Sequence, residues 1–358
     1  MAASVEQDSG SILDLGAFDA PLLLFGGAYS NLQALQAMLR VAREELHIPP
    51  ERMIHTGDVV AYCAQPLETT ELLRASGARC LLGNCEESVG VGKPDCGCGF
   101  PEDSACNAYS LNWYAHVSRH LADHPHLRDW MGGLPRRIEF SIAGRRFAVV
   151  HGSPRHVSEF LWPSTPDSEL RDCLRSLPAG VEGVISGHSG IPFARLVPPE
   201  PSDPSGRSRL WVNAGVLGMP ANDGTSRGWY AVLEPSGKGG LEVSIRALHY
   251  EVQQAANAIY AEQRLVRGYA DSLLSGVWPS HDVLPVEEQM ATGVALAESR
   301  LSWPAEPSRP SLARARPLDA RAAASMGLAA VALAASAVLA GWWLRGQQRH
   351  AGMLLARR

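Results

Sequence analysis

The segment "LLLFGGAYSNLQAL" (residues 22–35) decides how the rest of the chain is interpreted. Its apolar run predicts a buried strand, Gly26–Gly27 predicts a turn, and the residues from Asn31 onward have helical periodicity. A strand that ends in a glycine turn before a helix is where α/β proteins commonly build metal and phosphate sites. This loop, however, contains no carboxylate and no histidine. The chemistry of such a site therefore either lies elsewhere in the chain or has been lost.

The alternation of strand and helix continues beyond this segment. Helical periodicity follows in "NLQALQAMLRVAREEL", and two further strand-like runs are "RMIHTGD" and "ARCLLGN". From about residue 136 the strand-like runs become closer together, as in "RRIEFSIAG" and "RRFAVVHGS". We therefore predict an α/β fold, in which βαβ units form one sheet and a more antiparallel sheet packs face to face on it. Segment 252–276 has helical periodicity and is expected on the outside.

Length and composition restrict the class of protein. The chain has 358 residues, of which 46% are hydrophobic, so it can bury a large core. Its net charge of −5 lacks the basic stripe of a nucleic-acid-binding surface, and we expect none. Residues 1–19 form an N-terminal extension without the basic start of a secretory signal, so the body is expected in the cytoplasm. Seven cysteines favour reduced thiols, or a metal or redox role, over a disulfide framework.

The composition changes after about residue 290. Residues 291–321 are rich in Ala, Arg, Ser and Pro and are predicted to be a flexible linker. Residues 322–344 carry no charge. As a helix they would be about 34 Å long, enough to cross a hydrocarbon core of about 30 Å. We expect a single transmembrane helix and a basic tail at 345–358, with an Ala-rich surface helix as the alternative. Arginines on both sides leave the orientation undecided, so the cytoplasmic placement rests on the missing signal.

Four polar residues follow predicted strands at glycine-containing turns. They are Asp58 in "TGDVV", Asn84 in "LLGNCEE", His151 in "VVHGSPR" and His188 in "ISGHSG". The carboxyl ends of strands in stacked α/β sheets converge on one crevice. Such a mixed N/O set suits one divalent or trivalent first-row ion such as Mn, Fe or Zn. Each of these short segments, taken alone, is also explained by a turn, a helix cap or a structural histidine. The prediction therefore rests on the order of the four segments in the sequence.

That order resembles the calcineurin-like metallophosphoesterases, especially their small bacterial phosphodiesterase branch. Members carry Asp-x-His, Gly-Asp, Gly-Asn-His, His-Gly and Gly-His-x-His in this sequence. The last four are matched here by Gly57–Asp58, Gly83–Asn84, His151–Pro154 and Gly187–His188. The resemblance covers roughly residues 20–290. It implies a four-layer α/β/β/α sandwich with a metal site at the strand ends and phosphoester hydrolysis.

The departures from the family pattern affect one of its two metal sites. Gly27 and Tyr29 stand where the family has its first Asp and His, and Gly190 replaces the second His of Gly-His-x-His. These positions belong to the first metal site. The second site keeps Asp58 and the three residues named with it above. The resemblance therefore implies a mononuclear site, held by Asp58, Asn84, His151 and His188.

Three residues are candidates for catalysis. Cys85 occupies the position of the family histidine that contacts the phosphate and can protonate the leaving group. Acid catalysis, metal coordination, redox sensitivity and simple packing all stay open for its thiol. Asn84 and Arg155 are expected to help bind the phosphoryl oxygens.

Further cysteines lie in the Cys-rich insertion, residues 85–110. Cys96, Cys98 and Cys106 lack the paired Cys-x-x-Cys spacing of a zinc ribbon. Reduced thiols, a second thiol-rich metal or metalloid site formed with Cys85, and a reversible disulfide are the alternatives.

The function predicted first is a membrane-tethered, metal-dependent phosphoester hydrolase of phosphodiesterase or phosphatase type. Its substrate would be a phosphoester small molecule or a phosphorylated substrate. A non-hydrolytic metal-binding or redox/sensor module on the same scaffold is the alternative, and a pseudoenzyme that serves as an interaction domain is the third.

Overall fold

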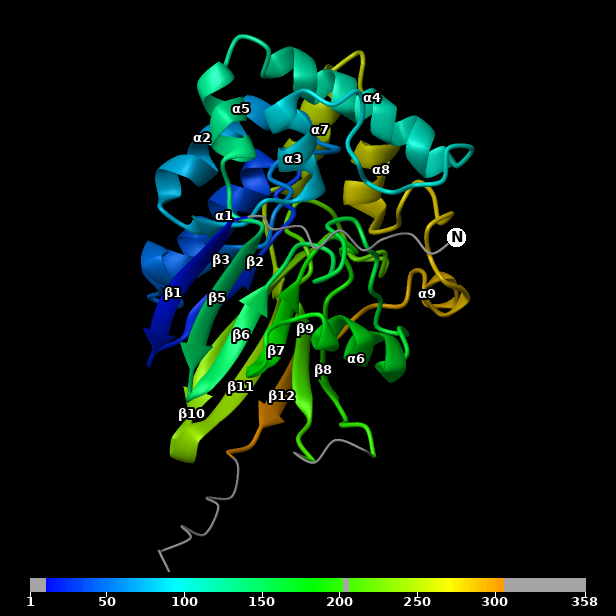
Figure 1. Ribbon diagram of the computed structural model, residues 1–358. Coiled ribbons are helices and arrows are strands. Elements are labelled where there is room, and N and C mark those ends of the chain that lie inside the picture. The colour runs from blue at the N-terminus through cyan, green and yellow to red at the C-terminus, as the bar shows by residue number, and fades with distance from the viewer. Residues whose placement is uncertain (1–10, 202–205, 306–358) are drawn as a thin grey trace, which may run out of the picture. The chain divides into compact units, whose positions relative to one another are not determined.

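The computed structural model describes residues 11–201 and 206–305, which contain two six-stranded mixed sheets (Figure 1). The first has the order β12-β11-β10-β2-β3-β4 and the second the order β1-β5-β6-β7-β9-β8. The strands of the first sheet are β2 (Leu22–Phe25), β3 (Met53–His55), β4 (Arg79–Cys80), β10 (Gly228–Ser236), β11 (Gly240–Leu248) and β12 (Ser299–Trp303). Those of the second are β1 (Ile12–Phe18), β5 (Arg137–Ile142), β6 (Arg145–Val149), β7 (Val181–Ser186), β8 (Phe193–Val197) and β9 (Arg209–Asn213).

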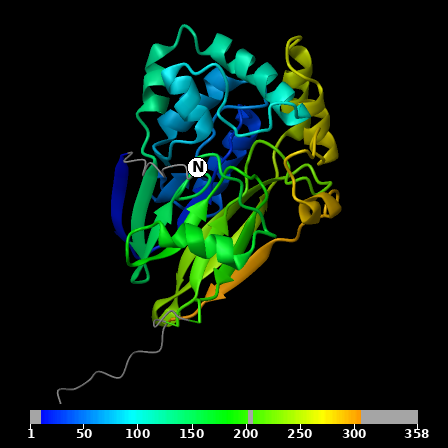
Figure 2. The same cartoon turned by 45° about the vertical axis from the view of Figure 1, so that its right-hand side comes forward.

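Helices cover the outer faces of both sheets. Figures 1 and 2 both show α6 (Asp167–Arg175) against the second sheet, away from the larger group of helices. That group is α1 (Leu32–Glu44), α2 (Pro66–Ser76), α3 (Asn84–Val91), α4 (Ala105–His120), α5 (Pro125–Gly132), α7 (Val252–Ala261) and α8 (Gly268–Ser275). A short helix, α9 (Val286–Met290), precedes β12. The helical segment predicted at 252–276 is thus two helices.

Three hydrophobic cores separate the layers. Leu22 and Leu24 of β2 point into the core between the sheets, where Phe147 of β6 lies. Leu23 and Phe25 belong to the core beneath the larger helical group. A third core joins α6 to the second sheet. Because alternate side chains of β2 face two cores, its continuous apolar run is explained. The predicted α/β/β/α layers are confirmed.

Two predicted domain boundaries need correction. Residues 12–18, placed in the 1–19 extension, form β1, which pairs in parallel with β5. Residues 299–303, placed in the 291–321 linker, form β12, which pairs with β11. Both are short strands at sheet edges, and most of their side chains are exposed or half-buried. Such strands lack the buried apolar pattern by which a strand is predicted.

The predicted membrane segment is a separate matter. Among residues 11–201 and 206–305, no helix has the length and apolar character needed to cross a bilayer. The predicted span at 322–344 and the tail at 345–358 lie outside the described residues.

Loops at the carboxyl ends of the inner strands are tied to one another by backbone hydrogen bonds. Gly27 N donates to Gly57 O at 2.9 Å, and Gly218 N donates to Gly27 O at 2.9 Å. Gly187 N donates to His151 O at 2.7 Å. The loops that carry the predicted site residues are therefore held in fixed positions.

Candidate metal centre

The four predicted ligands lie together, with Nε2 of His151 at their centre. This nitrogen is 3.1 Å from Asp58 Oδ2, 3.0 Å from Asn84 Oδ1 and 3.2 Å from His188 Nδ1. All four residues are buried. We refer to Asp58, Asn84, His151 and His188 as the ligand cluster.

Hydrogen bonds fix which atoms face the middle of the cluster. Nδ1 of His151 donates to the carbonyl oxygen of Thr56 at 2.7 Å, since a carbonyl can only accept. Nδ2 of Asn84 donates to the carbonyl oxygen of Cys96 at 2.9 Å, so Oδ1 of Asn84 points toward His151. In neutral His151 a lone pair on Nε2 therefore faces the oxygens of Asp58 and Asn84. This arrangement of electron-pair donors requires a cation, either a proton or a metal ion.

The charges of the cluster agree with this conclusion. Burial alone would raise the pKa of Asp58, but the charge and hydrogen bond of His151 lower it below its usual value. Burial alone would lower the pKa of His151, but Asp58 raises it. Without a metal ion, a proton shared with His151 serves as the cation. A metal ion in the cluster would replace that proton.

His188 offers a neutral imidazole. Burial, followed by the nearby His151, lowers the pKa of His188 to about 3. Its Nε2 is buried and has no hydrogen-bond partner among the described residues. The ring of Phe160 packs on it, with ring centroids 4.3 Å apart. Nδ1 of this buried neutral imidazole faces His151 and Nε2 is unused, so either nitrogen could be offered to a metal ion.

Two members of the cluster adopt strained backbone conformations. Asp58 has φ of 63° and His188 has φ of 59°, in the left-handed region that non-glycine residues rarely adopt. Strain of this kind persists where surrounding contacts impose it, and it gathers at functional sites.

Glu86 is a residue that the sequence interpretation missed. Its carboxylate accepts hydrogen bonds from three backbone amides: Asp58 N at 2.8 Å, Val59 N at 2.6 Å and Gly83 N at 2.8 Å. It thereby joins the loop after β3 to the start of α3. The Gly-x-x-Glu spacing at this helix start, which resembles a capping box, was the available signal.

The three candidate catalytic residues lie in different surroundings. Cys85 is buried behind Asp58, to whose Oδ1 its backbone N donates at 3.2 Å. Burial, then the charges of Asp58 and Glu86, raise the pKa of its thiol, which stays protonated. The guanidinium of Arg155 pairs with Glu159 and lies 3.5 Å from Glu169. These carboxylates occupy the donors that were expected to bind phosphoryl oxygens, whereas Asn84 lies in the cluster.

The three cysteines of the predicted thiol site do not gather. Cys96 and Cys98 form a disulfide, which was one of the alternatives for this loop. The two cysteines are only two residues apart in the sequence, and their Cα atoms are 5.3 Å apart. Cys106 is a free thiol. Its half-buried side chain lies in the wall of a different pocket.

The glycines at two family positions of the first site are enclosed to different degrees: Gly27 is tightly packed, and Gly190 borders an open pocket. A Cβ on Gly27 would lie 2.4 Å from Val216 Cγ1 and 2.8 Å from Tyr29 Cζ. A Cβ on Gly190 would lie 3.5 Å from Trp278 Cζ2. Among the described residues, the only other group of three possible metal ligands is on the surface. It consists of Glu71, His124 and His126. No group of three such ligands lies at Gly27, Tyr29 and Gly190 in the part of the chain that the structure describes.

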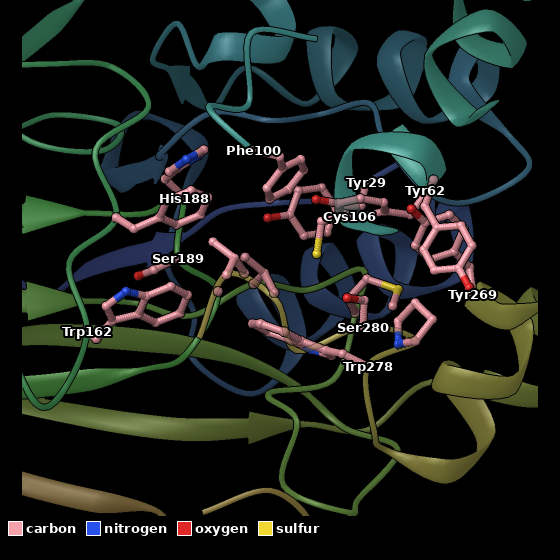
Figure 3. Close-up of a pocket in the computed structure, with 17 residues that line it drawn as sticks. Tyr29, Tyr62, Phe100, Cys106, Trp162, His188, Ser189, Tyr269, Trp278 and Ser280 are labelled. Atoms are coloured by element: carbon pink, nitrogen blue, oxygen red, sulfur yellow. The ribbon is translucent and has the colours of Figure 1, made fainter. Parts of the chain in front are cut away.

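The space beside Gly190 is a pocket lined largely by aromatic rings, which we call the aromatic pocket (Figure 3). His188 belongs both to its wall and to the ligand cluster. The pocket has a cavity volume of about 80 Å³.

Comparison with known proteins places this site in a family. The sequence profile of the calcineurin-like phosphoesterase superfamily domain matches residues 30–238, more than half of the chain. The chain belongs to the calcineurin-like phosphoesterase superfamily. An uncharacterized protein of Methanocaldococcus jannaschii is 23% identical over 256 residues, which are 69% of this chain and 95% of the relative.

Two solved structures have the same fold as this calcineurin-like phosphoesterase. A metallophosphoesterase from Sphaerobacter thermophilus has a TM-score of 0.54 and 21% identity, with 73% of this chain and all of that chain covered. A hypothetical protein from Pyrococcus horikoshii has a TM-score of 0.58 and 17% identity, with 72% and 99% covered. Membership confirms the predicted class, a metal-dependent phosphoester hydrolase.

The tight packing around Gly27 leads to a stability prediction. Gly27 has φ of 50° and Gly144 has φ of 76°, but a Cβ would meet nothing within 4 Å at Gly144. Gly144→Ala should cost about 1–2 kcal/mol of left-handed strain. Gly27→Ala should cost a further 1–3 kcal/mol or so, because its Cβ overlaps Val216. Urea denaturation measures the free energy of unfolding of both variants and of the parent protein. Equal losses in the two variants would show that the space at Gly27 is open.

A second prediction concerns Glu86. Glu86→Gln replaces one accepting oxygen by an amide donor that faces backbone N–H groups. The free energy of unfolding should fall by about 1–3 kcal/mol for each amide left without its acceptor. The neighbouring Glu87→Gln is the control, since Glu87 pairs near the surface with Lys93 and Arg136. Its loss should stay below about 1 kcal/mol. If both variants lose the same stability, Glu86 does not hold the two loops.

Proposed function

We propose that this chain is a phosphodiesterase or phosphatase with one metal ion, held by Asp58, Asn84, His151 and His188. The observation that carries the proposal is the set of electron-pair donors around Nε2 of His151. Mixed carboxylate, amide and imidazole ligands suit Mn, Fe or Zn. The tight packing around Gly27, and the lack of a carboxylate or imidazole at Gly27, Tyr29 and Gly190, support one ion rather than two.

A bound ion of this kind supplies Lewis-acid polarisation of a phosphoryl oxygen and acidifies water. The residues of the chain hold and orient the parts. Thr56 O fixes the imidazole of His151, as outer-shell carbonyls do in metal sites. The Cys96 carbonyl fixes the amide of Asn84, whose oxygen faces the cluster.

Cys85 takes a different part from the family histidine in this proposal. Its thiol is buried, keeps its proton and interacts with Asp58, so it orients that carboxylate. An exposed acid for the leaving group is therefore missing at this position. With one ion and no such acid, the enzyme should favour diesters and good leaving groups.

A second function is favoured by one observation. The Cys96–Cys98 disulfide lies against Asn84, whose Nδ2 is 3.3 Å from Cys98 Sγ. A redox change in this pair would reach a ligand of the cluster directly. A non-hydrolytic redox or sensor module is therefore the alternative to hydrolysis.

The place of action is also part of the proposal. We propose that residues 322–344 anchor the chain in a membrane and that the catalytic domain faces the cytoplasm. The charge-free stretch of 23 residues supports the anchor.

Metal content is the first test of this proposal. Full-length His126→Gln protein, which lacks one member of the surface group, should contain about one first-row ion per chain by mass spectrometry of the metal. Adding Asp58→Asn or His151→Ala should remove that ion, because each deletes a central donor. Adding His47→Ala, which changes an exposed histidine, should leave the content unchanged. Two ions per chain would contradict the mononuclear site, and none would contradict the metal centre.

Hydrolysis is the second test. The metal-loaded protein should cleave bis(p-nitrophenyl) phosphate. His188→Ala should lower kcat/KM by more than the roughly 10- to 100-fold that loss of an outer-shell partner costs. His47→Ala serves again as the control. If the metal-loaded protein cleaves neither this diester nor p-nitrophenyl phosphate, the hydrolase function fails. Metal content that changes with the redox state of the cysteines would then favour the sensor.

A further inference from the structure

The aromatic pocket has an unusual lining for the neighbour of a metal site. Of its 17 lining residues, eight are Phe, Tyr or Trp. None of the 17 lining residues is Asp, Glu, Lys or Arg. A concave site lined mainly by apolar and aromatic side chains is the usual form of a small-molecule site.

The rings of the pocket are fixed by contacts with one another. On the side of the ligand cluster, Phe160 stacks on Trp162 with centroids 5.4 Å apart and an angle of 4° between the planes. Toward the other end, the ring of Tyr62 contacts the rings of Tyr29 and Tyr269, with centroids 4.7 Å and 5.0 Å apart. Figure 3 shows Trp162 and His188 at one end and Tyr62 and Tyr269 at the other. The pocket is therefore preformed.

Trp278 links this pocket to the lost metal site. Its indole Nε1 donates to Pro220 O at 2.7 Å, and its backbone N donates to Asn222 Oδ1 at 2.9 Å. The ring is thereby anchored along the pocket, and its Cζ2 would lie 3.5 Å from a Cβ on Gly190. The indole therefore borders the position that corresponds to the second His of the family's Gly-His-x-His.

We propose that the aromatic pocket binds a planar aromatic ring carried by the substrate, while the attached phosphate lies at the ligand cluster. This inference rests on the proposed function, since the phosphate is placed by the metal centre. His188 is shared by the pocket and the cluster, so a ring in the pocket and a phosphate at the cluster are neighbours. Aromatic rings in contact gain more than their buried area alone supplies.

Two other occupants fit the pocket less well. Aromatic cages bind quaternary ammonium groups. Here, however, no carboxylate lines the pocket, and a divalent ion in the adjacent cluster would repel a second cation. An alkyl chain would bury apolar area but would make no ring pairs. Stacked or edge-on rings therefore favour an aromatic group, whether a nucleobase or an aryl ring.

The subsite also gives a reason why one ion can suffice. Binding energy from a part of the substrate that does not react can hold the reacting part in position. The ring in the pocket would position the phosphate, a task that a second ion shares in a two-metal site. The substrate class that follows is an aromatic or nucleoside phosphoester.

Binding of non-hydrolysable phosphonates tests this proposal on the metal-loaded, full-length protein. Calorimetry compares benzylphosphonate, the methylenephosphonate analogue of adenosine 5′-phosphate, butylphosphonate and 2-(trimethylammonio)ethylphosphonate. At least one of the two aromatic ligands should bind about 10-fold tighter than butylphosphonate. A preference for the adenosine compound identifies a nucleobase, and a preference for benzylphosphonate identifies an aryl ring. Equal or tighter binding of the butyl or trimethylammonio compound overturns the proposal.

Variants at Trp278 locate the effect. Trp278→Ala should abolish the aromatic preference, Trp278→Phe should keep most of it, and all variants should keep the metal content of the parent. Trp130→Ala is the control, because Trp130 is half-buried on α5 and outside the pocket. An equal loss for all four ligands in Trp278→Ala, or an aromatic preference that survives both Trp278 variants, overturns the proposal.

Failure of the proposed function is distinguishable from failure of the subsite. If the chain loads no metal, the metal centre fails. Benzyl alcohol and 1-butanol are then compared by quenching of tryptophan fluorescence in the metal-free protein. Tighter binding of benzyl alcohol, lost in Trp278→Ala, supports the pocket, and the absence of that preference overturns it.

Discussion

The hydrogen bond from His151 Nδ1 to the Thr56 carbonyl is the interaction on which the site depends. Thr56 follows β3 of one sheet and His151 follows β6 of the other, so this bond connects the two sheets at their carboxyl ends. It also turns the free nitrogen of the imidazole toward Asp58 and Asn84. Because the cluster is buried, bulk water cannot solvate these electron-pair donors. The face-to-face packing of the sheets therefore forms a site that favours a cation.

Close backbone approach makes this packing possible. A Cβ on Gly57 would lie 2.6 Å from His151 Nδ1, and a Cβ on Gly83 would lie 2.5 Å from Asp58 Oδ1. Each glycine directly precedes a ligand, Asp58 or Asn84. The Gly-Asp and Gly-Asn pairs of the sequence thus have a steric meaning: the glycine allows the approach that brings its neighbour into the cluster.

The sequence predicted what depends on local pattern and missed what depends on tertiary contacts. The layers and the ligand cluster follow from apolar strands that end at glycine turns. The edge strands at 12–18 and 299–303 carry little buried pattern. The pairing of Arg155 with Glu159, four residues along the chain, occurs in a non-helical loop, so helical spacing did not predict it. The aromatic pocket draws on residues from Tyr29 to Trp278, which share no spacing and meet only in the folded chain.

In the proposed mononuclear site, the two glycines at the family's first-site positions lie in different surroundings. A Cβ on Gly27 would overlap Val216 and Tyr29, whereas a Cβ on Gly190 would make an ordinary contact with Trp278 at the edge of the aromatic pocket. A carboxylate restored at position 27 alone would be buried against Val216 and Tyr29 without a cation, which costs several kcal/mol. A histidine restored at position 190 would adopt a strained left-handed backbone, since Gly190 has φ of 75°, and would extend into the aromatic pocket. Packing therefore disfavours a ligand at position 27, whereas backbone conformation disfavours one at position 190.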